Sequence, residues 1–291
     1  MKASCSNTFH SYFWPPSKLN RAEIQHLSDS NLANSFEKSF NCDPQEPFQR
    51  ILDSLYDYID PTTRYMHRLR INLFVDLVRG LISDGTITNF NSAIDIGCNC
   101  GIYSKLISDF GFKEVRGIDI DQPLLDKANK YVAITSGEKK ITFENFNAEK
   151  LIGENQYDFI LCTEVIEHTG NPKQVINNIK HILKPGGVAI ITLPNGMSYP
   201  YLLTRISHKL QGKPYDGELR DHLNYPSYRA MQLFKDPALT KVRISGTNLF
   251  QWYFLHKIPG YPVLNRLNYF LSRIFPLKYF SQFFFMVYKR K

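Results

Sequence analysis

The sequence has too few cysteines, in the wrong arrangement, for a disulfide-stapled secreted protein. Five cysteines occur among 291 residues, and Cys98, Cys100 and Cys162 fall in a glycine-containing turn and an apolar run. An odd number placed in this way is not typical of a disulfide framework. Residues 1–13 lack the continuous apolar segment of a secretory signal. We therefore expect a protein of the reducing cytoplasm that can also associate with a membrane.

Long hydrophobic runs are absent, and so are acidic residues near the C-terminus. The most apolar stretch, residues 269–288, is broken by Arg273, Pro276 and Lys278, and a spanning helix needs about 20 apolar residues. Asp236 is the last acidic residue, and nine Lys or Arg follow it. This basic, aromatic C-terminal region suits peripheral contact with an anionic membrane, a nucleic acid or an anionic substrate, or is simply a solvated face.

What is present is an alternation of short apolar runs and helical patterns between residues 91 and 195. Such alternation indicates parallel βαβ units with right-handed crossovers, hence an α/β fold with a doubly wound sheet. The predicted strands are Ser92–Ile96, Glu114–Ile118, Ile141–Asn145, Tyr157–Cys162, Val188–Leu193, Val242–Gly246 and Gln282–Tyr288. The predicted helices between them are Gly101–Phe110, Gln122–Ile134 and Pro172–Leu183.

The flanks of this core are less regular. Residues 1–60 read as an N-terminal extension with helical segments, and a helix is predicted from Pro61 to Ile82 because leucines recur at i+4 steps. Residues 195–226 carry little regular signal, and we expect a loop there, followed by a helix at Pro226–Phe234. We predict a domain over residues 61–291 with a core at 91–195, substrate-side elements at 196–240 and 248–280, and a C-terminal helical insertion that includes Val263–Ile274.

The run Ala93-Ile-Asp-Ile-Gly-Cys-Asn-Cys-Gly101 leads from a predicted strand through a tight turn into a helix. It matches neither the dinucleotide pattern G-x-G-x-x-G, which fails at Asn99, nor the phosphate loop G-x-x-x-x-G-K-[ST]. Asp95 can take a cationic amino group, directly or through water. Asp119 ends the next strand, 18 residues after Gly101, where an acidic residue accepts from ribose hydroxyls. Two carboxylates beside a glycine turn suit a cationic nucleoside better than a pyrophosphate.

Five segments in register resemble the motifs of class I S-adenosylmethionine (SAM)-dependent methyltransferases, which include the ubiquinone-pathway O-methyltransferases. They are Asp95–Gly101, Gly117–Asp119, Asn147–Glu149, Tyr157–Cys162 and the pair Leu183–Gly187 with Ile191–Asn195. The resemblance implies a Rossmann-like, seven-stranded, mostly parallel sheet and SAM as cofactor. It also implies cofactor contacts at Asp95, Gly97, Cys98, Asn99, Gly101, Asp119, Ile120, Asn147, Ala148 and Cys162. Asn99 and Cys100 replace commoner small residues, and Asn147 replaces the usual Asp.

The segment Glu164-Val-Ile-Glu-His168 follows the fourth strand and is the first place to look for catalytic groups. On a helical turn, Glu164, Glu167 and His168 would share one side. They would then ligate a divalent metal, or His168, with Glu164 beside it, would act as general base, or the segment would only shape the pocket. His222 is a second candidate base. We read Cys98 and Cys100 as small loop residues and not as metal ligands.

Aromatic residues are frequent in the three segments that flank the core, Met1–Ile82, Gly196–Ser227 and Asn248–Phe280, and we expect these flanks to recognise the acceptor. They favour a small-molecule, lipid-linked or glycan acceptor, methylated at oxygen. An RNA methyltransferase is the first alternative, although no RNA-binding module is recognisable. A non-catalytic protein that binds SAM is the second, and the intact Asp95, Asp119 and loop glycines argue against it.

Overall fold

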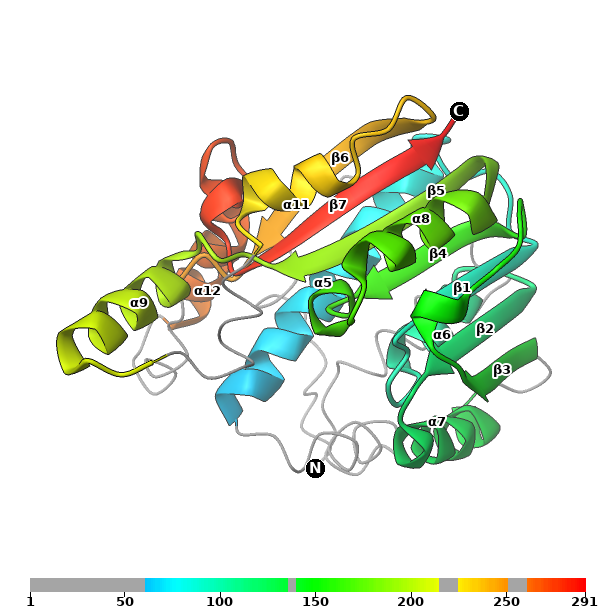
Figure 1. Ribbon diagram of the computed structural model, residues 1–291, viewed down its shortest axis with the longest axis horizontal. Coiled ribbons are helices and arrows are strands. Elements are labelled where there is room, and N and C mark those ends of the chain that lie inside the picture. Colours follow the sequence, from blue (N-terminus) through cyan, green and yellow to red (C-terminus); the bar gives the residue numbers. More distant parts are fainter. Residues whose placement is uncertain (1–60, 136–139, 215–224, 251–260) are drawn as a thin grey trace, which may run out of the picture.

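A computed structural model describes residues 61–135, 140–214, 225–250 and 261–291. Seven strands form one sheet in the order β3-β2-β1-β4-β5-β7-β6, with helices on both faces (Figure 1). Only β7 runs antiparallel to its neighbours, β5 and β6. The predicted α/β fold with a seven-stranded, mostly parallel sheet is confirmed. The strands are β1 Ser92–Ile96, β2 Glu114–Asp119, β3 Lys140–Asn145, β4 Tyr157–Thr163, β5 Leu183–Pro194, β6 Leu239–Thr247 and β7 Phe283–Arg290.

Alternate residues along the central strands enter two separate cores, one on each face of the sheet. Phe159 and Leu161 of β4 pack with helices α5 (Pro61–Ser83) and α6 (Ile102–Asp109). Ile160 and Cys162 pack with α8 (Pro172–Ile182) and α11 (Ser227–Leu233). Burial of both faces explains why these strands appear in the sequence as continuous apolar runs. The predicted first helix is confirmed as α5, and its Leu69, Leu73, Leu77 and Leu81 are buried.

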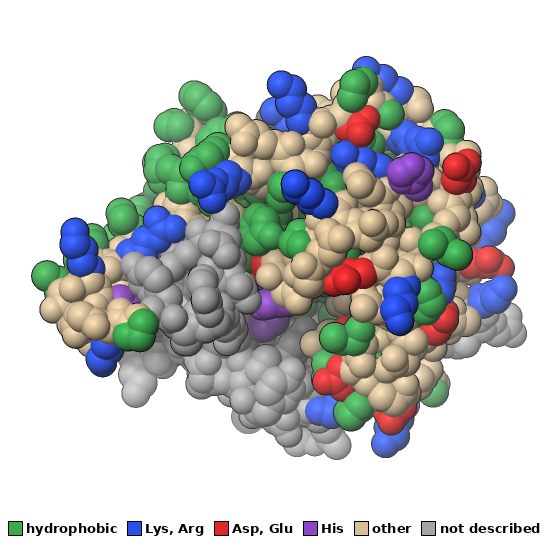
Figure 2. Space-filling view, in the orientation of Figure 1, with side chains coloured by type: hydrophobic (Ala, Val, Ile, Leu, Met, Phe, Trp, Pro, Cys, Tyr) green, Lys and Arg blue, Asp and Glu red, His purple; other side chains and the backbone are tan. Residues whose placement is uncertain are grey.

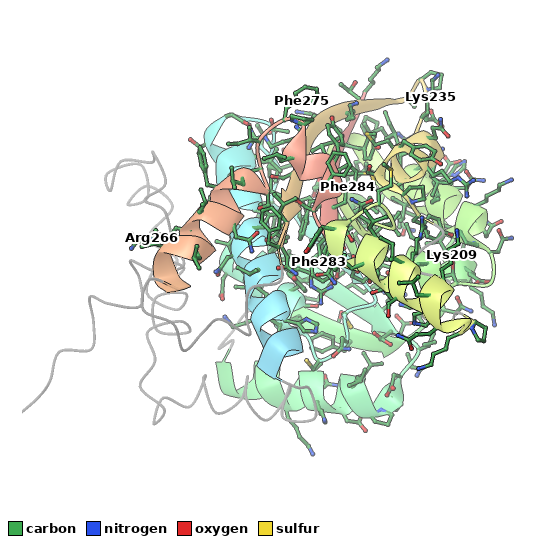
Figure 3. The ribbon with its side chains drawn as sticks, turned by 90° about the vertical axis from the view of Figure 1, so that its left-hand side faces the viewer. Lys209, Lys235, Arg266, Phe275, Phe283 and Phe284 are labelled. Carbon is green, nitrogen blue, oxygen red and sulfur yellow. The ribbon has the colours of Figure 1, made fainter. Side chains whose placement is uncertain are left out.

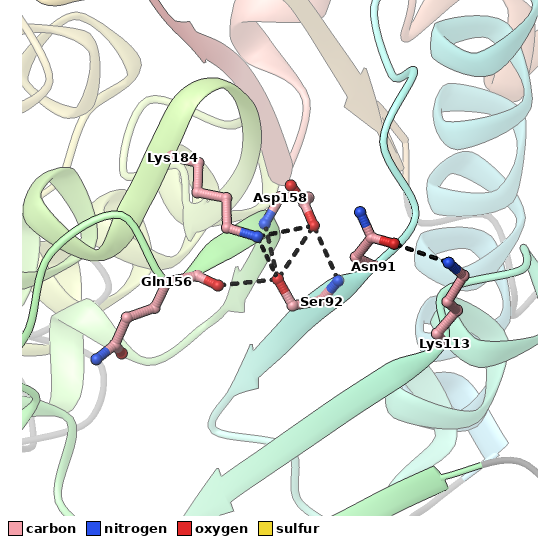
Figure 4. A network of polar contacts seen from close by, with 6 residues as sticks. All are labelled: Asn91, Ser92, Lys113, Gln156, Asp158 and Lys184. Atoms are coloured by element: carbon pink, nitrogen blue, oxygen red, sulfur yellow. Dashed lines mark hydrogen bonds and ion pairs between the residues drawn. The ribbon is translucent and has the colours of Figure 1, made fainter.

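Polar contacts tie β1, β4 and β5 together at the amino edge of the sheet (Figure 4). The backbone N–H of Ser92 donates to Asp158 Oδ2 at 2.9 Å, and the Lys184 ammonium lies 3.2 Å from the same oxygen. The Ser92 hydroxyl donates to the Gln156 carbonyl at 2.8 Å. These contacts align the three strands at one end, so the loops at their carboxyl ends meet at the other.

Two expectations about secondary structure need correction. Residues 195–226 contain a helix, α9 (Tyr199–Gln211), where we expected a loop. None of its residues is buried, so its apolar repeat does not face the core as that of the other helices does. Strand β5 begins at Leu183, where we expected the preceding helix to end, and so starts five residues before the predicted strand Val188–Leu193.

The remaining elements follow the expectations closely. Helix α7 (Gln122–Thr135) lies between β2 and β3, and α12 (Tyr261–Leu271) provides the predicted insertion between β6 and β7. The N-terminal extension and His222 lie outside the described residues. The division of the chain at residues 60 and 61 stays a prediction.

Candidate active site

A pocket of about 420 Å³ opens at the carboxyl edge of the sheet. In doubly wound sheets, ligands bind at this edge, where the crossovers diverge to opposite faces. The loops after β1, β2, β3 and β4 form most of the wall, and α5 closes one side. Its lining includes Gly97, Cys98, Asn99, Cys100, Asp119, Ile120, Asn147, Ala148, Glu164 and His168, together with His67 and Arg70.

The turn after β1 is held open by left-handed backbone at three positions. Gly97, Asn99 and Gly101 have φ of 72°, 49° and 80°. The N–H groups of Gly97 and Cys98 both donate to the Ile118 carbonyl, at 2.8 and 3.0 Å. Asn99 replaces a commoner glycine without breaking the turn, because asparagine tolerates this region of φ and its Oδ1 accepts from the Cys100 N–H at 2.7 Å.

Gly97→Ala is expected to destabilise the protein more than the matched change Gly85→Ala. Both glycines have φ near 72°, so both changes incur the left-handed strain of about 1–2 kcal/mol. An added Cβ at Gly97 would lie only 2.1 Å from Val165 Cγ2, whereas at Gly85 nothing lies within 4 Å. Overpacking costs about 1–3 kcal/mol more, which denaturant unfolding can measure. Equal losses in the two variants would contradict the predicted clash, and Val165→Ala is expected to relieve it.

Asp119 binds the turn from the neighbouring strand. Its Oδ2 accepts from the Asn99 N–H at 2.8 Å, and its Oδ1 accepts from the Asp121 N–H at 3.0 Å. Asp119 ends β2, as expected, and its carboxylate lies in the pocket wall. A carboxylate oxygen has a second lone pair, so each can accept another hydrogen bond from a ligand.

Asp95 lies beneath the turn and is not part of the pocket wall. Its Oδ2 accepts from the Ser104 hydroxyl at 2.7 Å, while its buried Oδ1 has no hydrogen-bond partner among the described residues. Burial raises the pKa of Asp95 to about 7, against the Ser104 hydrogen bond, which lowers it. A buried carboxylate oxygen without a partner fits a cationic group that a ligand would bring.

After β3, the side chain at the position that resembles the family's adenine contact caps a short helix. Asn147 Oδ1 accepts from the Glu149 N–H at 2.8 Å and begins the 3₁₀-helix η2 (Ala148–Lys150). Glu149 in turn accepts from the N–H groups of Gly170 and Asn171, at 2.7 and 3.1 Å, and so joins this loop to the one after β4. Ile120 is 73% exposed at the lip of the pocket. Cys162, by contrast, is enclosed in the core behind the wall.

The predicted helical turn over Glu164, Glu167 and His168 is wrong. Glu164 has φ of 54° and precedes the 3₁₀-helix η3, which covers only Ile166–His168. Its carboxylate accepts from the Thr192 hydroxyl at 2.8 Å and lies 3.8 Å from the Arg70 guanidinium. Burial is the largest influence on the Glu164 carboxyl and raises its pKa.

His168 keeps its place in the pocket wall, but no metal site forms around it. Its Nε2 lies 3.9 Å from Oε1 of the buried Glu167, and the His168 side chain is 47% exposed. Across the described ranges, no three His, Cys, Asp or Glu side chains converge on a position for a metal ion. The trio of Glu164, Glu167 and His168 therefore does not fit a divalent metal.

Sequence reasoning missed three polar residues of the wall, His67, Arg70 and Tyr103. Arg70 NH2 lies 2.5 Å from His67 Nδ1, and its guanidinium lies 4.5 Å from the centre of the Phe283 ring. Burial and the Arg70 charge lower the pKa of His67 to about 2, so its imidazole is neutral. No motif marks His67 and Arg70, because the periodicity of α5 reports only its leucine stripe, and none marks Tyr103 on α6.

The chain is similar in sequence to known methyltransferases. Residues 64–235 match the family model described as "Methyltransferase domain". The ubiquinone biosynthesis O-methyltransferase of Rickettsia bellii is 30% identical over 168 residues, which cover 57% of this chain and 67% of that protein. The enzyme of the same name from Leptothrix cholodnii is 28% identical over 170 residues, covering 56% and 68%.

Solved structures show the same fold at low sequence identity. The magnesium protoporphyrin IX methyltransferase of Synechocystis PCC 6803, determined with bound SAH, has a TM-score of 0.54 and 15% identity over 92% of this chain and 99% of that one. The PH0226 protein of Pyrococcus horikoshii OT3 has a TM-score of 0.51 and 19% identity, covering 81% and 98%. The family model spans more than half of the chain, and the glycine turn, Asp119 and the carboxyl-edge pocket lie in the positions expected from the sequence. The chain therefore belongs to the methyltransferase-domain family and is a class I SAM-dependent methyltransferase.

Proposed function

We propose that this enzyme methylates an oxygen atom of a small-molecule acceptor, and that the acceptor is apolar or lipid-linked. The observation that carries the proposal is the similarity to two ubiquinone biosynthesis O-methyltransferases across about two thirds of their length. The aromatic flanks support an apolar acceptor. On α9 and α12, the apolar side chains of Leu202, Leu203, Leu267 and Phe270 are exposed.

The pocket offers a position for each polar part of SAM. We infer that Asp119 accepts hydrogen bonds from the ribose hydroxyls and that Asn147 and Ala148 lie against the adenine. Asp95 would neutralise the amino group, directly or through water, and Arg70 would face the carboxylate. The turn at Gly97–Gly101 would pass beneath the cofactor, where the absence of a Cβ lets the backbone approach closely.

When bound, SAM supplies a methyl carbon on a sulfonium, which an acceptor oxygen displaces in line. The residues of this chain mainly hold the two reactants in alignment and exclude water. We infer that His168 removes the hydroxyl proton, since its imidazole lies in the wall and is partly exposed. Glu164 is engaged by Thr192 and Arg70, which suits a residue that positions the loop. His67 is a poor base, because a pKa of about 2 lies far from neutral pH.

Affinity for SAM is expected to fall as the pH falls through about 7, the value to which burial raises the pKa of Asp95. Only the ionised carboxylate can neutralise the amino group, and it is protonated below that pH. In the cofactor-free protein the sign is opposite for stability. A raised carboxyl pKa stabilises the fold most below its ordinary value of 3.8, and this stability is lost as the pH rises through about 7. Calorimetric titrations across this range test the prediction, which fails if Asp95→Asn shows the same pH dependence of affinity as the parent.

Methyl transfer from labelled SAM into a lysate of the native organism tests the class of acceptor. The lysate is divided into lipid, RNA and other small-molecule fractions after the reaction. Label in the lipid or small-molecule fraction, released by chemistry specific for methyl ethers or esters, is the expected result. Label confined to RNA would overturn the proposal in favour of an RNA methyltransferase.

We further propose that the basic, aromatic C-terminal region contacts a membrane surface peripherally. Within the residues placed by the structure, no helix is long and apolar enough to cross a bilayer. Val263, Leu267 and Phe270 of α12 are exposed along one stripe. Arg273, however, lies 3.1 Å from Asp76 of α5, and Lys278 donates to the Ile244 carbonyl at 3.3 Å, so these two cations also hold the region on the domain. Co-sedimentation with anionic vesicles measures the contact.

A further inference from the structure

Helix α9 is amphipathic, yet its apolar face is turned outward. Its exposed apolar residues follow the helical repeat at Leu202, Leu203, Ile206 and Leu210, with exposed fractions of 51%, 48%, 48% and 82%. A surface helix of a globular protein normally buries such a stripe against the core. Here α9 buries no residue at all. The stripe is therefore available to something outside the described part of the chain.

Cations lie next to the stripe. Arg205, Lys209 and Lys213 surround an open hollow of about 340 Å³ together with Ile206 and Pro214. The sequence contains no Asp or Glu between residues 195 and 215. Figure 2 shows blue and green side chains together over α9, at the left-hand end of the molecule. A positive hollow beside an apolar stripe matches a surface that is negative outside and apolar beneath, which is the arrangement of an anionic lipid leaflet.

The helix also stands at the pocket's edge of the sheet. It follows β5, whose carboxyl end lies on the same edge as the active-site loops. The Tyr199 ring lies 5.8 Å from that of Phe250, whose backbone exchanges two hydrogen bonds with the Asn268 side chain of α12. Helices α9 and α12 thus belong to one end of the molecule, which Figure 3 shows from the front with Lys209 and Arg266 labelled.

We propose that α9 docks the enzyme on the surface of an anionic phospholipid bilayer. Leu202, Leu203, Ile206 and Leu210 enter the boundary between head groups and acyl chains, while Arg205, Lys209 and Lys213 contact lipid phosphates. This goes beyond the contact proposed for the C-terminal region, because it assigns binding to a helix outside that region. It does not depend on the identity of the acceptor.

The test is co-sedimentation of the full chain with two kinds of vesicle, phosphatidylcholine alone and phosphatidylcholine mixed with phosphatidylglycerol. The parent should bind the mixed vesicles, more weakly as salt is added, and bind the neutral ones poorly. Neutralising two cations in Lys209→Gln/Lys213→Gln should weaken binding about 25-fold, at about fivefold for each charge near the surface. Leu203→Ser/Ile206→Ser should weaken it at least about tenfold for each side chain removed.

Matched controls separate the contribution of α9 to vesicle binding from that of the protein's overall charge and apolar surface. Lys130→Gln/Lys173→Gln removes two exposed lysines on α7 and α8, outside both proposed membrane contacts, and Ile152→Ser removes a side chain that is 85% exposed. Both should bind like the parent, and all variants should keep the parent's calorimetric affinity for SAM, since none touches the pocket. Parent-like vesicle binding by both α9 variants would overturn the proposal. So would equal binding to neutral vesicles, or self-association of the parent that Leu203→Ser/Ile206→Ser abolishes, because the stripe would then bind a second copy.

Discussion

Replacing Asp119 by alanine is expected to weaken SAM binding by at least about 100-fold. The change removes two hydrogen bonds from ribose hydroxyls to a charged group, each contributing about 1.5–3 kcal/mol. It also removes the acceptor for the Asn99 N–H, which lies 2.8 Å from Asp119 Oδ2. The glycine turn then loses its attachment to β2, so part of the effect comes from the turn itself. Isothermal titration calorimetry of SAM measures the loss.

The matched control is Asp126→Ala. Asp126 is an exposed carboxylate on α7 that accepts from Gln122 at 3.0 Å and lies outside the pocket wall. Its loss should leave the affinity for SAM unchanged. That result would show that the removal of one negative charge does not by itself cause the loss of affinity in Asp119→Ala. Unchanged affinity in Asp119→Ala itself would refute the placement of the ribose. Asp119→Asn refines the result, since an amide keeps one acceptor for Asn99 but loses the charge.

Substitution of His168 by glutamine is expected to lower kcat by about 10²–10⁴-fold while the affinity for SAM stays at the parent's value. The factor is the usual contribution of a positioned general base. The reason is geometric, because His168 lies in the pocket wall beside the buried Glu167 and its side chain is 47% exposed. The other imidazole in this wall, His67, is a poor base. Single-turnover methyl transfer from labelled SAM into the acceptor fraction shows that the chemical step is slowed, separately from product release.

His181→Gln is the control, because His181 is an exposed histidine on α8 whose Nδ1 lies 2.7 Å from the Asn177 carbonyl. It should retain the parent's kcat. A general base also imposes a rise of kcat with pH, which His168→Gln should lose. A kcat near the parent's value in His168→Gln would remove His168 from the chemistry, and His222 would become the base to test.

The part of the pocket wall formed by the glycine turn and Asp119 could be predicted because its residues are close together in the sequence or end successive strands. The turn from Gly97 to Gly101 is local, so its glycines, its Asn99 and the following helix can be recognised without the fold. Asp119 is 18 residues away, but a strand that pairs in parallel with β1 brings its end to the same edge. The alternation of strands and helices predicts that pairing.

The segment from Glu164 to His168 shows where local reasoning fails. Spacing at i, i+3 and i+4 predicts a shared helical side, but Thr192 of β5 and Arg70 of α5 hold the Glu164 side chain in a different direction. Both contacts are distant in sequence. A bond between residues 164 and 192, or 70 and 164, exists only after the sheet and its covering helix have assembled.

The sequence by itself determined the fold class, the cofactor and the residues expected around it, since parallel strands deliver their ends to one edge whatever surrounds them. Only the tertiary structure decided that Arg70 and His67 complete the pocket wall, that Glu164 is engaged by Thr192 and Arg70, and that the apolar stripe of α9 faces outward. The physical reason is that burial and charge pairing depend on which helix packs on which face. Periodicity reports that a helix has an apolar side, and packing alone decides whether that side meets the core or a lipid surface.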